Sequence, residues 1–246
     1  MPHKERELSI LEYLRIHKEA SVGELCRALF VSEPTMRRDL ASLNSQGKII
    51  RTHGGAAHRS APGENLPQSL REKEMSDAKQ AIGKKCLSLI KDGDVIMVDA
   101  SSTALALLRA LDPSLSVVVI TNNAKAPLIL SEKKAKTFVT GGELAKNTFA
   151  FVGSHAEEYI RAFNADICFF SVRTLTPNGD LTDNAIAENS LRKIMLQRSR
   201  KSVLMLDSKK VGEPCISTLA SLSDIDHVVC ERDISGEFPD YAEKFI

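Results

Sequence analysis

The chain has 246 residues, of which 43% are hydrophobic and 26% charged, a composition typical of a globular protein with one or two domains. No apolar run approaches the roughly 18 residues of a membrane-spanning helix, and the amino terminus lacks the apolar core of a signal peptide. We therefore expect a cytoplasmic protein without a membrane partner. The net charge is +1, and the basic excess over residues 1–60 is modest, so charge supports nucleic-acid binding only weakly.

Cysteine and histidine usage argues against a metal centre. The five cysteines are widely spaced, include no CxxC pair and mostly have apolar neighbours. This pattern favours buried thiols over disulfides or a zinc site. The six histidines show no spacing typical of metal ligands. We therefore predict neither a metal nor another cofactor.

Three helices are predicted in the first part of the chain. Leucines and a tyrosine give an apolar face to a helix from about Lys4 to His17. Ser21 and Glu24 match a capping box, which begins a second helix of about eight residues. Pro34 fits the first turn of a third helix but disfavours helical geometry at Glu33, so the start of that helix is uncertain by one residue.

The stretch SEPTMRRDL, residues 32–40, begins this third helix. Met36, Leu40 and Leu43 recur at i, i+4 and i+7, so they share one buried stripe. The residues on and beside the opposite face are small, polar or cationic: Thr35, Arg37, Arg38, Ala41, Ser42 and Ser45. Such a surface can approach a duplex without steric bulk. We interpret the segment as a DNA-recognition helix.

A basic, glycine-rich segment follows the third helix. Gly47 is a natural residue to end that helix, and residues 48–55 indicate a strand and tight turn. A short helix, a turn, a polar helix and a basic β-wing together predict a winged helix-turn-helix. The candidate DNA contacts are Ser32, Thr35, Arg37, Arg38, Lys48, Arg51 and His53. Arg37 and Arg38 would divide phosphate and base-edge contacts, and their order is left open. An amphipathic surface helix would explain the arginine pair but not the wing.

The remainder of the chain predicts a second, larger domain. Residues 59–68 are rich in proline and poor in apolar residues, and we interpret them as a linker between residues 1–58 and 69–246. Beyond the linker, apolar runs of strand length alternate with helical patterns. The predicted strands cover residues 95–99, 117–121, 137–140, 167–172, 203–207 and 227–230, and the predicted helices cover 78–90, 103–111, 124–130, 155–163 and 185–198. This alternation predicts an open, mostly parallel α/β sheet with helices on its faces.

Four of these strands end in polar residues. The sets are Asp99 with Ser101, Ser102 and Thr103; Thr121 with Asn122 and Asn123; Gly141 with Gly142; and Asp207 with Lys209. Parallel strands end along one edge of their sheet, where open α/β folds bind ligands, so we expect one site there. Hydroxyls at a helix N-terminus suit an anion, Lys209 offers a positive charge, and Asp99 and Asp207 can accept from sugar hydroxyls. This set of hydroxyls, amides, carboxylates and a lysine suits a phosphorylated polyol.

Each of these polar sets also has a purely structural interpretation. The hydroxyls and asparagines can cap helices, the glycines can form a turn, and the lysine can be a solvated surface residue. The coincidence of four strand ends favours a binding site over these separate explanations.

SEPTMRRDL followed by IIRTHGGA closely resembles the DeoR family of bacterial transcriptional regulators, whose signature is a Ser-Glu-x-Thr-aliphatic-Arg-Arg-Asp-Leu helix and an Arg-x-His-Gly-Gly-Ala wing. The second domain is similar to the DeoR-type sensor domain in an Asp-x-Gly-Thr-Thr loop, a Thr-Asn-Ser/Asn stretch, a Gly-Gly turn and an Asp-Ser-Lys segment. These align in order with residues 99–103, 121–123, 141–142 and 207–209. The resemblance implies an allosteric phosphosugar-binding domain, related in fold to ribose-5-phosphate isomerase, that controls DNA affinity and oligomerises.

The chain departs from the family pattern at two places. Ser101-Ser102 replaces the usual Gly-Thr, which brings backbone less easily against a phosphate. Arg173 stands where many relatives have a glycine-rich segment, and it is a candidate for a bidentate anion contact or for a surface ion pair. Glu188, with Arg192 or Lys193, is a further candidate, although charges at this spacing usually form a solvated face. These departures leave the identity of the effector open.

We therefore predict a sequence-specific regulator, expected to repress carbohydrate metabolism genes, that binds double-stranded operator DNA and a phosphorylated sugar. A helix-turn-helix monomer reads too short a site, so a homodimer or higher homo-oligomer is expected. One alternative is a phosphosugar isomerase-like enzyme with an accessory helix domain, although the sequence offers no clear catalytic pair. Another is an architectural DNA binder whose affinity no metabolite changes.

Overall fold

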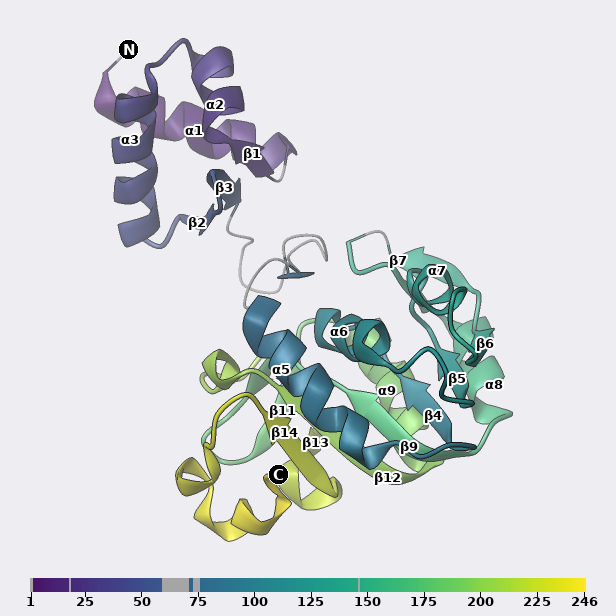
Figure 1. Ribbon diagram of the computed structural model, residues 1–246. Coiled ribbons are helices and arrows are strands. Elements are labelled where there is room, and N and C mark those ends of the chain that lie inside the picture. The colour runs from purple at the N-terminus through teal and green to yellow at the C-terminus, as the bar shows by residue number, and fades with distance from the viewer. Residues whose placement is uncertain (1, 18, 59–70, 73–75, 146) are drawn as a thin grey trace. The chain divides into compact units, whose positions relative to one another are not determined.

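The computed structural model describes residues 2–17, 19–58, 71–72, 76–145 and 147–246. The chain divides into two compact units, Met1–Glu74 and Met75–Ile246. Figure 1 shows a small helical unit at the purple end of the chain and a larger unit built on a sheet. The predicted linker, residues 59–68, lies outside the described residues, so the domain boundaries at 58 and 69 stay predictions.

The first unit has three helices and a small antiparallel sheet. Its elements are α1 (His3–His17), β1 (Glu19–Ser21), α2 (Val22–Leu29), α3 (Glu33–Ser45), β2 (Ile49–Thr52) and β3 (Gly55–His58). The sheet order is β1-β3-β2, with both pairings antiparallel. The three predicted helices and the strand β2 are confirmed. The sequence did not indicate β1, which contributes only three residues.

Local sequence signals set the helix ends in this unit. The backbone N–H of Ser21 donates to Glu24 Oε2 at 2.7 Å, and the N–H of Glu24 donates to Ser21 Oγ at 3.2 Å, which confirms the capping box. Pro34 lies in the first turn of α3, and Gly47 follows that helix with a φ of +68°. The predicted stripe of Met36, Leu40 and Leu43 is fully buried. It packs against α1 and α2 in one hydrophobic core.

The second unit is built on a six-stranded parallel sheet. Its strands are β4 (Val95–Val98), β5 (Val118–Thr121), β6 (Lys136–Val139), β9 (Ala165–Phe170), β12 (Ser199–Leu206) and β14 (His227–Cys230), in the order β14-β12-β9-β4-β5-β6. Every pairing in this sheet is parallel. The six strands predicted from apolar runs are confirmed. The inner strands are largely buried on both faces, which is why they contain apolar runs, whereas the edge strand β6 is only half-buried or exposed.

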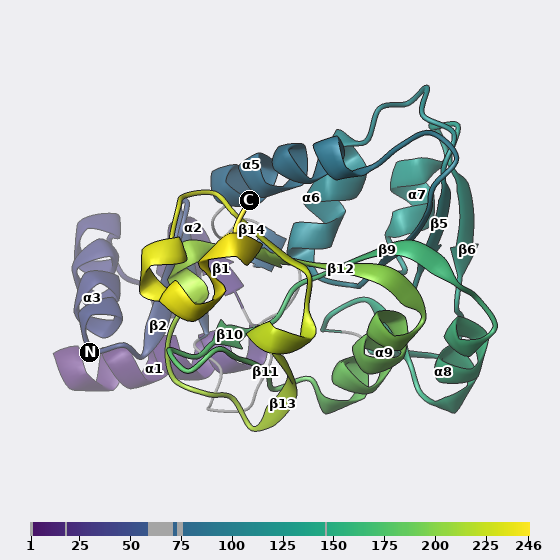
Figure 2. The same cartoon turned by 90° about the horizontal axis from the view of Figure 1, so that it is seen from below.

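Helices cover both faces of this sheet (Figure 2). The helices are α5 (Ser76–Cys86), α6 (Ser102–Ala110) and α7 (Ala126–Leu130) on one face, with α8 (Ser154–Arg161) and α9 (Ile186–Gln197) on the other. Each face has its own hydrophobic core. The predicted open α/β architecture is therefore confirmed. No helix among the described residues is long and apolar enough to cross a membrane.

Two small antiparallel sheets accompany the main sheet. One has the order β10-β11-β13, from β10 (Thr174–Leu175), β11 (Asp180–Asp183) and β13 (Ser217–Ser221), and the other pairs β7 (Glu143–Ala145) with β8 (Ala150–Val152). Short 3₁₀ helices cover Leu87–Leu89, Ser208–Lys210, Leu222–Asp224, Ser235–Glu237 and Pro239–Lys244. None of these short strands was predicted, because they cover only two to five positions and all except the three-residue β8 mix polar and apolar residues.

The order of the parallel strands reverses beside β4. From β4 the chain adds β5 and β6 on one side, and it then returns to add β9, β12 and β14 on the other. The reversal therefore lies between β4 and β9. In open α/β sheets, ligands bind in the crevice at the carboxyl ends of the strands where such a reversal occurs. The residues that follow β4 and β9 are Asp99 and Ser171.

Candidate functional site

The predicted recognition helix α3 is held against α1 by a buried carboxylate. Asp39 is 1% exposed, and its carboxylate pairs with the Arg6 guanidinium, whose Nη2 lies 3.1 Å from Oδ1. His3 Nδ1 lies 3.0 Å from the same oxygen. Burial opposes ionisation of Asp39, but the hydrogen bond and charge of Arg6, together with His3, outweigh it and lower the pKa of the carboxyl. The cluster fixes α3 relative to α1.

The outward face of α3 carries the predicted small and cationic residues. Arg37, Arg38, Ala41 and Ser45 are exposed. Ser42 differs from the prediction, because it is half-buried and its hydroxyl donates to Glu7 Oε1 of α1 at 2.7 Å. The face is therefore narrower than the sequence indicated.

Ser32 and Thr35 bond to each other at the start of α3. Their hydroxyl oxygens lie 3.0 Å apart, and the Ser32 side chain makes no capping bond to the helix backbone. The first N–H groups of a helix have no partner within it, so those at the start of α3 could bind a phosphate.

The wing is a tight hairpin that depends on two glycines. Gly54 has a φ of +88°, and its carbonyl accepts from the Val22 N–H at 2.8 Å. A Cβ atom on Gly55 would lie 2.2 Å from the carbonyl oxygen of Ala20 in β1. The wing therefore requires a residue without a side chain at Gly55.

The predicted wing contacts differ in exposure. Lys48 and His53 are exposed, while Arg51 is half-buried. The Nη1 atom of Arg51 is buried and has no hydrogen-bond partner within the described residues. A buried guanidinium nitrogen without an acceptor is costly, and a phosphate oxygen would supply one.

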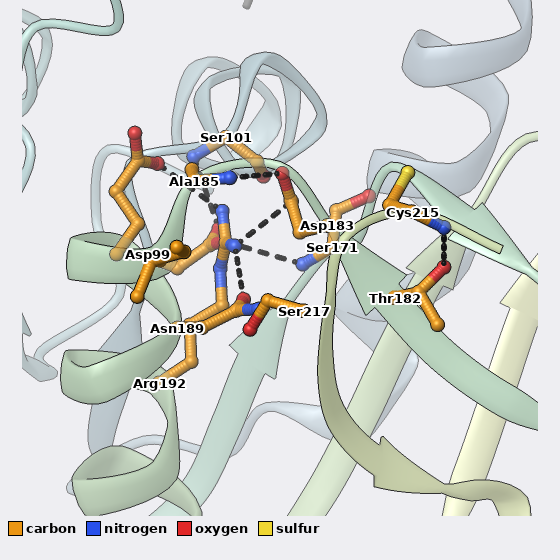
Figure 3. Close-up of polar contacts among 12 residues, drawn as sticks. Asp99, Ser101, Ser171, Thr182, Asp183, Ala185, Asn189, Arg192, Cys215 and Ser217 are labelled. Atoms are coloured by element: carbon orange, nitrogen blue, oxygen red, sulfur yellow. Dashed lines mark hydrogen bonds and ion pairs between the residues drawn. The ribbon is translucent and has the colours of Figure 1, made fainter. Parts of the chain in front are cut away.

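In the second unit, Asp99 joins several segments at the sheet edge (Figure 3). Its Oδ1 accepts from the Ser101 N–H at 3.1 Å, and its Oδ2 accepts from the Ser171 N–H at 3.3 Å. The same Oδ2 accepts from Arg192 Nε at 2.8 Å. The carboxylate thus bridges the ends of β4 and β9 to helix α9. Both oxygens of Asp99 are engaged by protein donors, whereas the sequence had suggested acceptance from sugar hydroxyls.

Three carboxylates surround the guanidinium of Arg192, and Figure 3 labels two of their residues, Asp99 and Asp183. Nη1 donates to Asp183 Oδ2 at 3.0 Å and Nη2 to Glu188 Oε2 at 3.2 Å, in addition to the bond to Asp99. Burial would lower the pKa of Arg192, but the carboxylates outweigh it and raise the pKa. Glu188 and Arg192 are 5% and 3% exposed, so the expected solvated face is wrong. The spacing rule failed because both side chains point into the protein.

The polar residues after β5 are fully enclosed. Thr121 Oγ1 donates to the Val98 carbonyl at 2.6 Å and accepts from the Asn123 N–H at 3.0 Å. Asn122 Nδ2 donates to the Phe151 carbonyl at 3.1 Å, and Asn123 Oδ1 accepts from the Lys125 N–H at 2.8 Å. Asn122 Oδ1 and Asn123 Nδ2 are buried without partners in the described part of the chain. Each asparagine therefore offers one unused polar atom.

The loop after β4 caps helix α6. Ser101 Oγ accepts from the Ala104 N–H at 3.0 Å, so its hydroxyl has the structural role that the sequence left open. Ser102 and Thr103 are buried in the first turn of the helix. Thr103 Oγ1 is buried and, among the residues described, has no hydrogen-bond partner.

The glycine pair after β6 is required by the backbone. Gly141 and Gly142 have φ values of +63° and +103°. A Cβ atom on Gly142 would lie 2.8 Å from the Val152 carbonyl oxygen of β8. The pair forms the turn that leads into the β7-β8 hairpin, which is the structural alternative that the sequence offered.

The lysine at the sheet edge is Lys210 rather than Lys209. Lys209 is exposed. Lys210 Nζ lies 2.8 Å from Ser171 Oγ and 3.6 Å from Asp207 Oδ2. Arg173 is half-buried, and its side chain has no recorded ion pair within the described ranges. The site therefore brings together Asp99, Ser171, Asp207 and Lys210, and it leaves Lys209 in solvent.

Both units of the chain match models of one protein family. A family model for the DeoR-like helix-turn-helix domain matches residues 6–61, and one for the DeoR C-terminal sensor domain matches residues 74–232. The chain belongs to the DeoR family. It is therefore a transcriptional regulator with a helix-turn-helix DNA-binding domain and a DeoR-type sensor domain.

Relatives of this DeoR-family chain are named as transcriptional regulators. An uncharacterised HTH-type regulator, YulB of Bacillus subtilis, is 32% identical over 94% of this chain and 89% of its own. The transcriptional repressor GlcR of the same species is 30% identical over 99% and 94%. The L-fucose operon activator of Haemophilus influenzae is 30% identical over 97% and 96%. These names support a regulatory role rather than an enzymatic one.

Part of the regulator is also similar to solved structures. Ribose 5-phosphate isomerase A from Methanocaldococcus jannaschii aligns with a TM-score of 0.43 and 19% identity, over 56% of this chain and 55% of that one. The full-length sorbitol operon regulator SorC from Klebsiella pneumoniae aligns with a TM-score of 0.37 and 12% identity, over 83% and 88%.

Three polar residues of this DeoR-family protein were missed by sequence reasoning. Asp39 lies within the RRDL stretch and Ser171 directly follows β9, so the signal that could have found both is their position in the sequence. Lys210 neighbours the lysine that was chosen. None of the three stood out by residue type, since a single polar residue beside an apolar run is common at the surface.

The cysteines of the regulator are free thiols. Cys86, Cys168 and Cys230 are buried, and Cys26 and Cys215 are half-buried. Burial raises the pKa of Cys86 and of Cys230 to about 12, which keeps both as neutral thiols. No cluster of three His, Cys, Asp or Glu among the described residues is placed to hold a metal ion.

Proposed function

We propose that this DeoR-family regulator represses transcription, and that a phosphorylated sugar at the carboxyl edge of its parallel sheet controls its affinity for operator DNA. One observation carries the effector proposal. Three buried polar atoms near this edge have no hydrogen-bond partner among the described residues, namely Thr103 Oγ1, Asn122 Oδ1 and Asn123 Nδ2. They belong to the ends of the neighbouring strands β4 and β5.

Unpartnered buried polar atoms are rare because each costs about 1–3 kcal/mol. Two such atoms lie directly after β5, and the third lies in the first turn of the helix that follows β4. A threonine hydroxyl donates and accepts, the Asn122 amide oxygen accepts, and the Asn123 amide nitrogen donates. Vicinal hydroxyls of a sugar would satisfy this mixed set.

The phosphate is expected at the start of α6. Nine helical residues follow the Ser101 cap, and their aligned peptide dipoles favour an anion at Ser102 and Thr103. Lys210 and Arg173 are the proposed cations on the side of the phosphate away from α6, because both follow strands that end at this edge. We leave Asp99 out of the direct contacts, since both of its oxygens are already engaged.

The DNA interface is proposed at α3 and the wing. The exposed Arg37, Arg38, Lys48 and His53, with the half-buried Arg51, supply the positive charges for phosphate contacts. Two copies of the recognition helix would read two half-sites, so we propose a homodimer or higher homo-oligomer in the cytoplasm.

A ligand screen tests the effector proposal directly. A panel of sugar phosphates is added to the full chain in a thermal-shift assay, beside each parent sugar and inorganic phosphate alone. We expect at least one sugar phosphate to raise the melting temperature and to change the affinity for an operator selected from a random duplex pool. If no sugar phosphate changes either quantity, the effector proposal is wrong.

The direction of regulation needs a second experiment. The selected operator is placed ahead of a reporter gene, and expression is measured with and without the regulator. Repression predicts higher expression without it. Lower expression without it would make the protein an activator and would contradict the proposed direction.

A further inference from the structure

Glu33 and Arg37 form an exposed ion pair on one flank of α3. Glu33 Oε2 lies 3.3 Å from Arg37 Nη2, and the two side chains are 60% and 56% exposed. The two residues lie one helical turn apart on α3, at positions i and i+4.

The second arginine of the stretch is placed differently. At 100° per residue, Arg38 lies opposite the buried stripe, together with Pro34 and Ala41, and all three are exposed. No ion pair of Arg38 is recorded among the described residues. Within the described residues, Arg37 therefore pairs with an acid and Arg38 does not.

A carboxylate beside a duplex needs a physical reason. DNA phosphates repel it, and non-specific binding consists almost entirely of the attraction between phosphates and basic residues. Stabilisation of the first turn of α3 by an acidic residue is one reason, but Asp or Glu at any exposed first-turn position would serve it. Glu33 lies at the amino-terminal end of the recognition helix, which is the end that contacts base edges.

We propose that Glu33 is a specificity-determining residue of the DNA interface, which repels phosphates in non-operator complexes and accepts a hydrogen bond from cytosine N4 in the operator. A carboxylate is the usual acceptor for that amino group in the major groove. Arg37 is held by Glu33 until the operator is bound. Exposed pairs of this kind are weak, so Arg37 can leave Glu33 when the correct base pair is present.

The test compares Glu33→Gln with the wild-type chain on two duplexes. One is the operator that the wild type selects from a random pool, and the other is a shuffled duplex of equal length and composition. We expect affinity for the shuffled duplex to rise about three- to tenfold, because one repulsive charge is removed and Arg37 is released to contact phosphate. Operator affinity should not rise, so the ratio of the two affinities falls. Selection with Glu33→Gln should also relax the preference at one C·G pair.

Two controls separate this effect from altered folding or net charge. Glu158→Gln removes an exposed acid from α8, in the other unit, and should leave the affinity ratio unchanged. Arg37→Ala alone and combined with Glu33→Gln completes a double-mutant cycle. In the Arg37→Ala background, Glu33→Gln should raise the affinity for the shuffled duplex at most half as much, because no arginine is then released. Helix content and melting temperature of each variant are measured first.

The outcomes distinguish this inference from the proposed function on which it rests. If the wild type does not prefer any selected duplex over the shuffled one, sequence-specific DNA binding itself is wrong. If the wild type discriminates but Glu33→Gln keeps the same ratio and base preferences, the role of Glu33 is overturned while the DNA-binding function stands. A gain that persists undiminished without Arg37 overturns the pairing of the two residues as its cause.

Discussion

Arg192 Nε donates to Asp99 Oδ2 at 2.8 Å, although 93 residues separate the two in sequence. The contact connects helix α9 to the loop that begins α6. The same guanidinium binds Asp183 at the end of β11 and Glu188 on its own helix. One side chain therefore fixes three segments around the proposed effector site.

Arg192→Met should strongly destabilise the second unit. The substitution keeps most of the side-chain volume but leaves three buried carboxylates without their cation. Breaking a buried ion pair in this way costs about 3–5 kcal/mol. Urea denaturation of the full chain, followed by circular dichroism, measures the free energy of unfolding.

Arg200→Met is the matched control for that experiment. Arg200 is 84% exposed, and its Nη1 lies 3.4 Å from Asp166 Oδ1. Because an exposed pair contributes less than about 1 kcal/mol, the control should unfold almost as the wild type does. Equal losses in the two variants would contradict the special role of the buried cluster.

Thr103→Val should separate effector binding from stability. Valine has the shape of threonine without the hydroxyl, and Thr103 Oγ1 has no partner among the residues described. Removing an unsatisfied buried hydroxyl is expected to leave the melting temperature unchanged or higher. The affinity for the sugar phosphate, measured by titration calorimetry, should fall at least tenfold, because the ligand loses one hydrogen bond.

Thr121→Val provides the comparison for Thr103→Val. Thr121 Oγ1 already donates to the Val98 carbonyl and accepts from the Asn123 N–H. Its removal should lower stability by about 1–3 kcal/mol, because both partners are buried. A stability loss at Thr103 as large as that at Thr121 would show that the Thr103 hydroxyl serves the fold instead of a ligand.

Sequence patterns predicted the frame of the protein because its strands obey simple rules. The strand β4 is a continuous apolar run, and β9 and β12 each end in one. The capping box at Ser21 and the glycine at Gly47 mark helix ends. The sequence did not predict the strands β10 and β11, because pairing with other strands rather than local composition defines them.

The candidate site was predictable in location but not in detail. Parallel strand ends meet at one edge, which placed Asp99 and Asn123 correctly in one region. Sequence could not show that Arg192 is the partner of Asp99, because nothing local links residues so far apart. It also could not distinguish Lys209 from Lys210, since consecutive residues after a strand differ only in the direction of their side chains.

Asp39→Asn should weaken the attachment of the proposed recognition helix α3 to α1. The pKa of Asp39 is lowered, so its ionised form stabilises the fold above the unfolded-state pKa of about 3.9. We expect a loss of about 1–3 kcal/mol at neutral pH, because the amide cannot pair with Arg6 as a charge does. Hydrogen exchange of peptides from α3 measures the loss.

The pH dependence of the Asp39→Asn effect follows from the sign of that shift. The stabilisation by Asp39 is present above about pH 4 and disappears as the pH falls through the lower folded-state pKa. The difference in protection between the wild type and Asp39→Asn should therefore shrink on acidification, after correction for intrinsic exchange rates. A constant difference down to pH 3 would show that the charge of Asp39 is not its source.

Phe30→Asn should stabilise the turn between α2 and α3. Phe30 has a φ of +53° and is 95% exposed. Its left-handed backbone conformation is therefore unfavourable, and its ring gains no packing energy that would offset this. Asparagine tolerates this conformation, and we expect a gain of about 0.5–1 kcal/mol in the free energy of unfolding. Phe149→Asn is the contrast, because Phe149 has a φ of +52° but is half-buried, with Lys125 Nζ 4.5 Å from its ring centroid. That variant should lose stability, since the lost packing exceeds the relief of strain.

A loss of stability in both variants would show that the Phe30 ring also packs against the protein in solution. DNA titration of Phe30→Asn would then test whether the ring contacts the duplex.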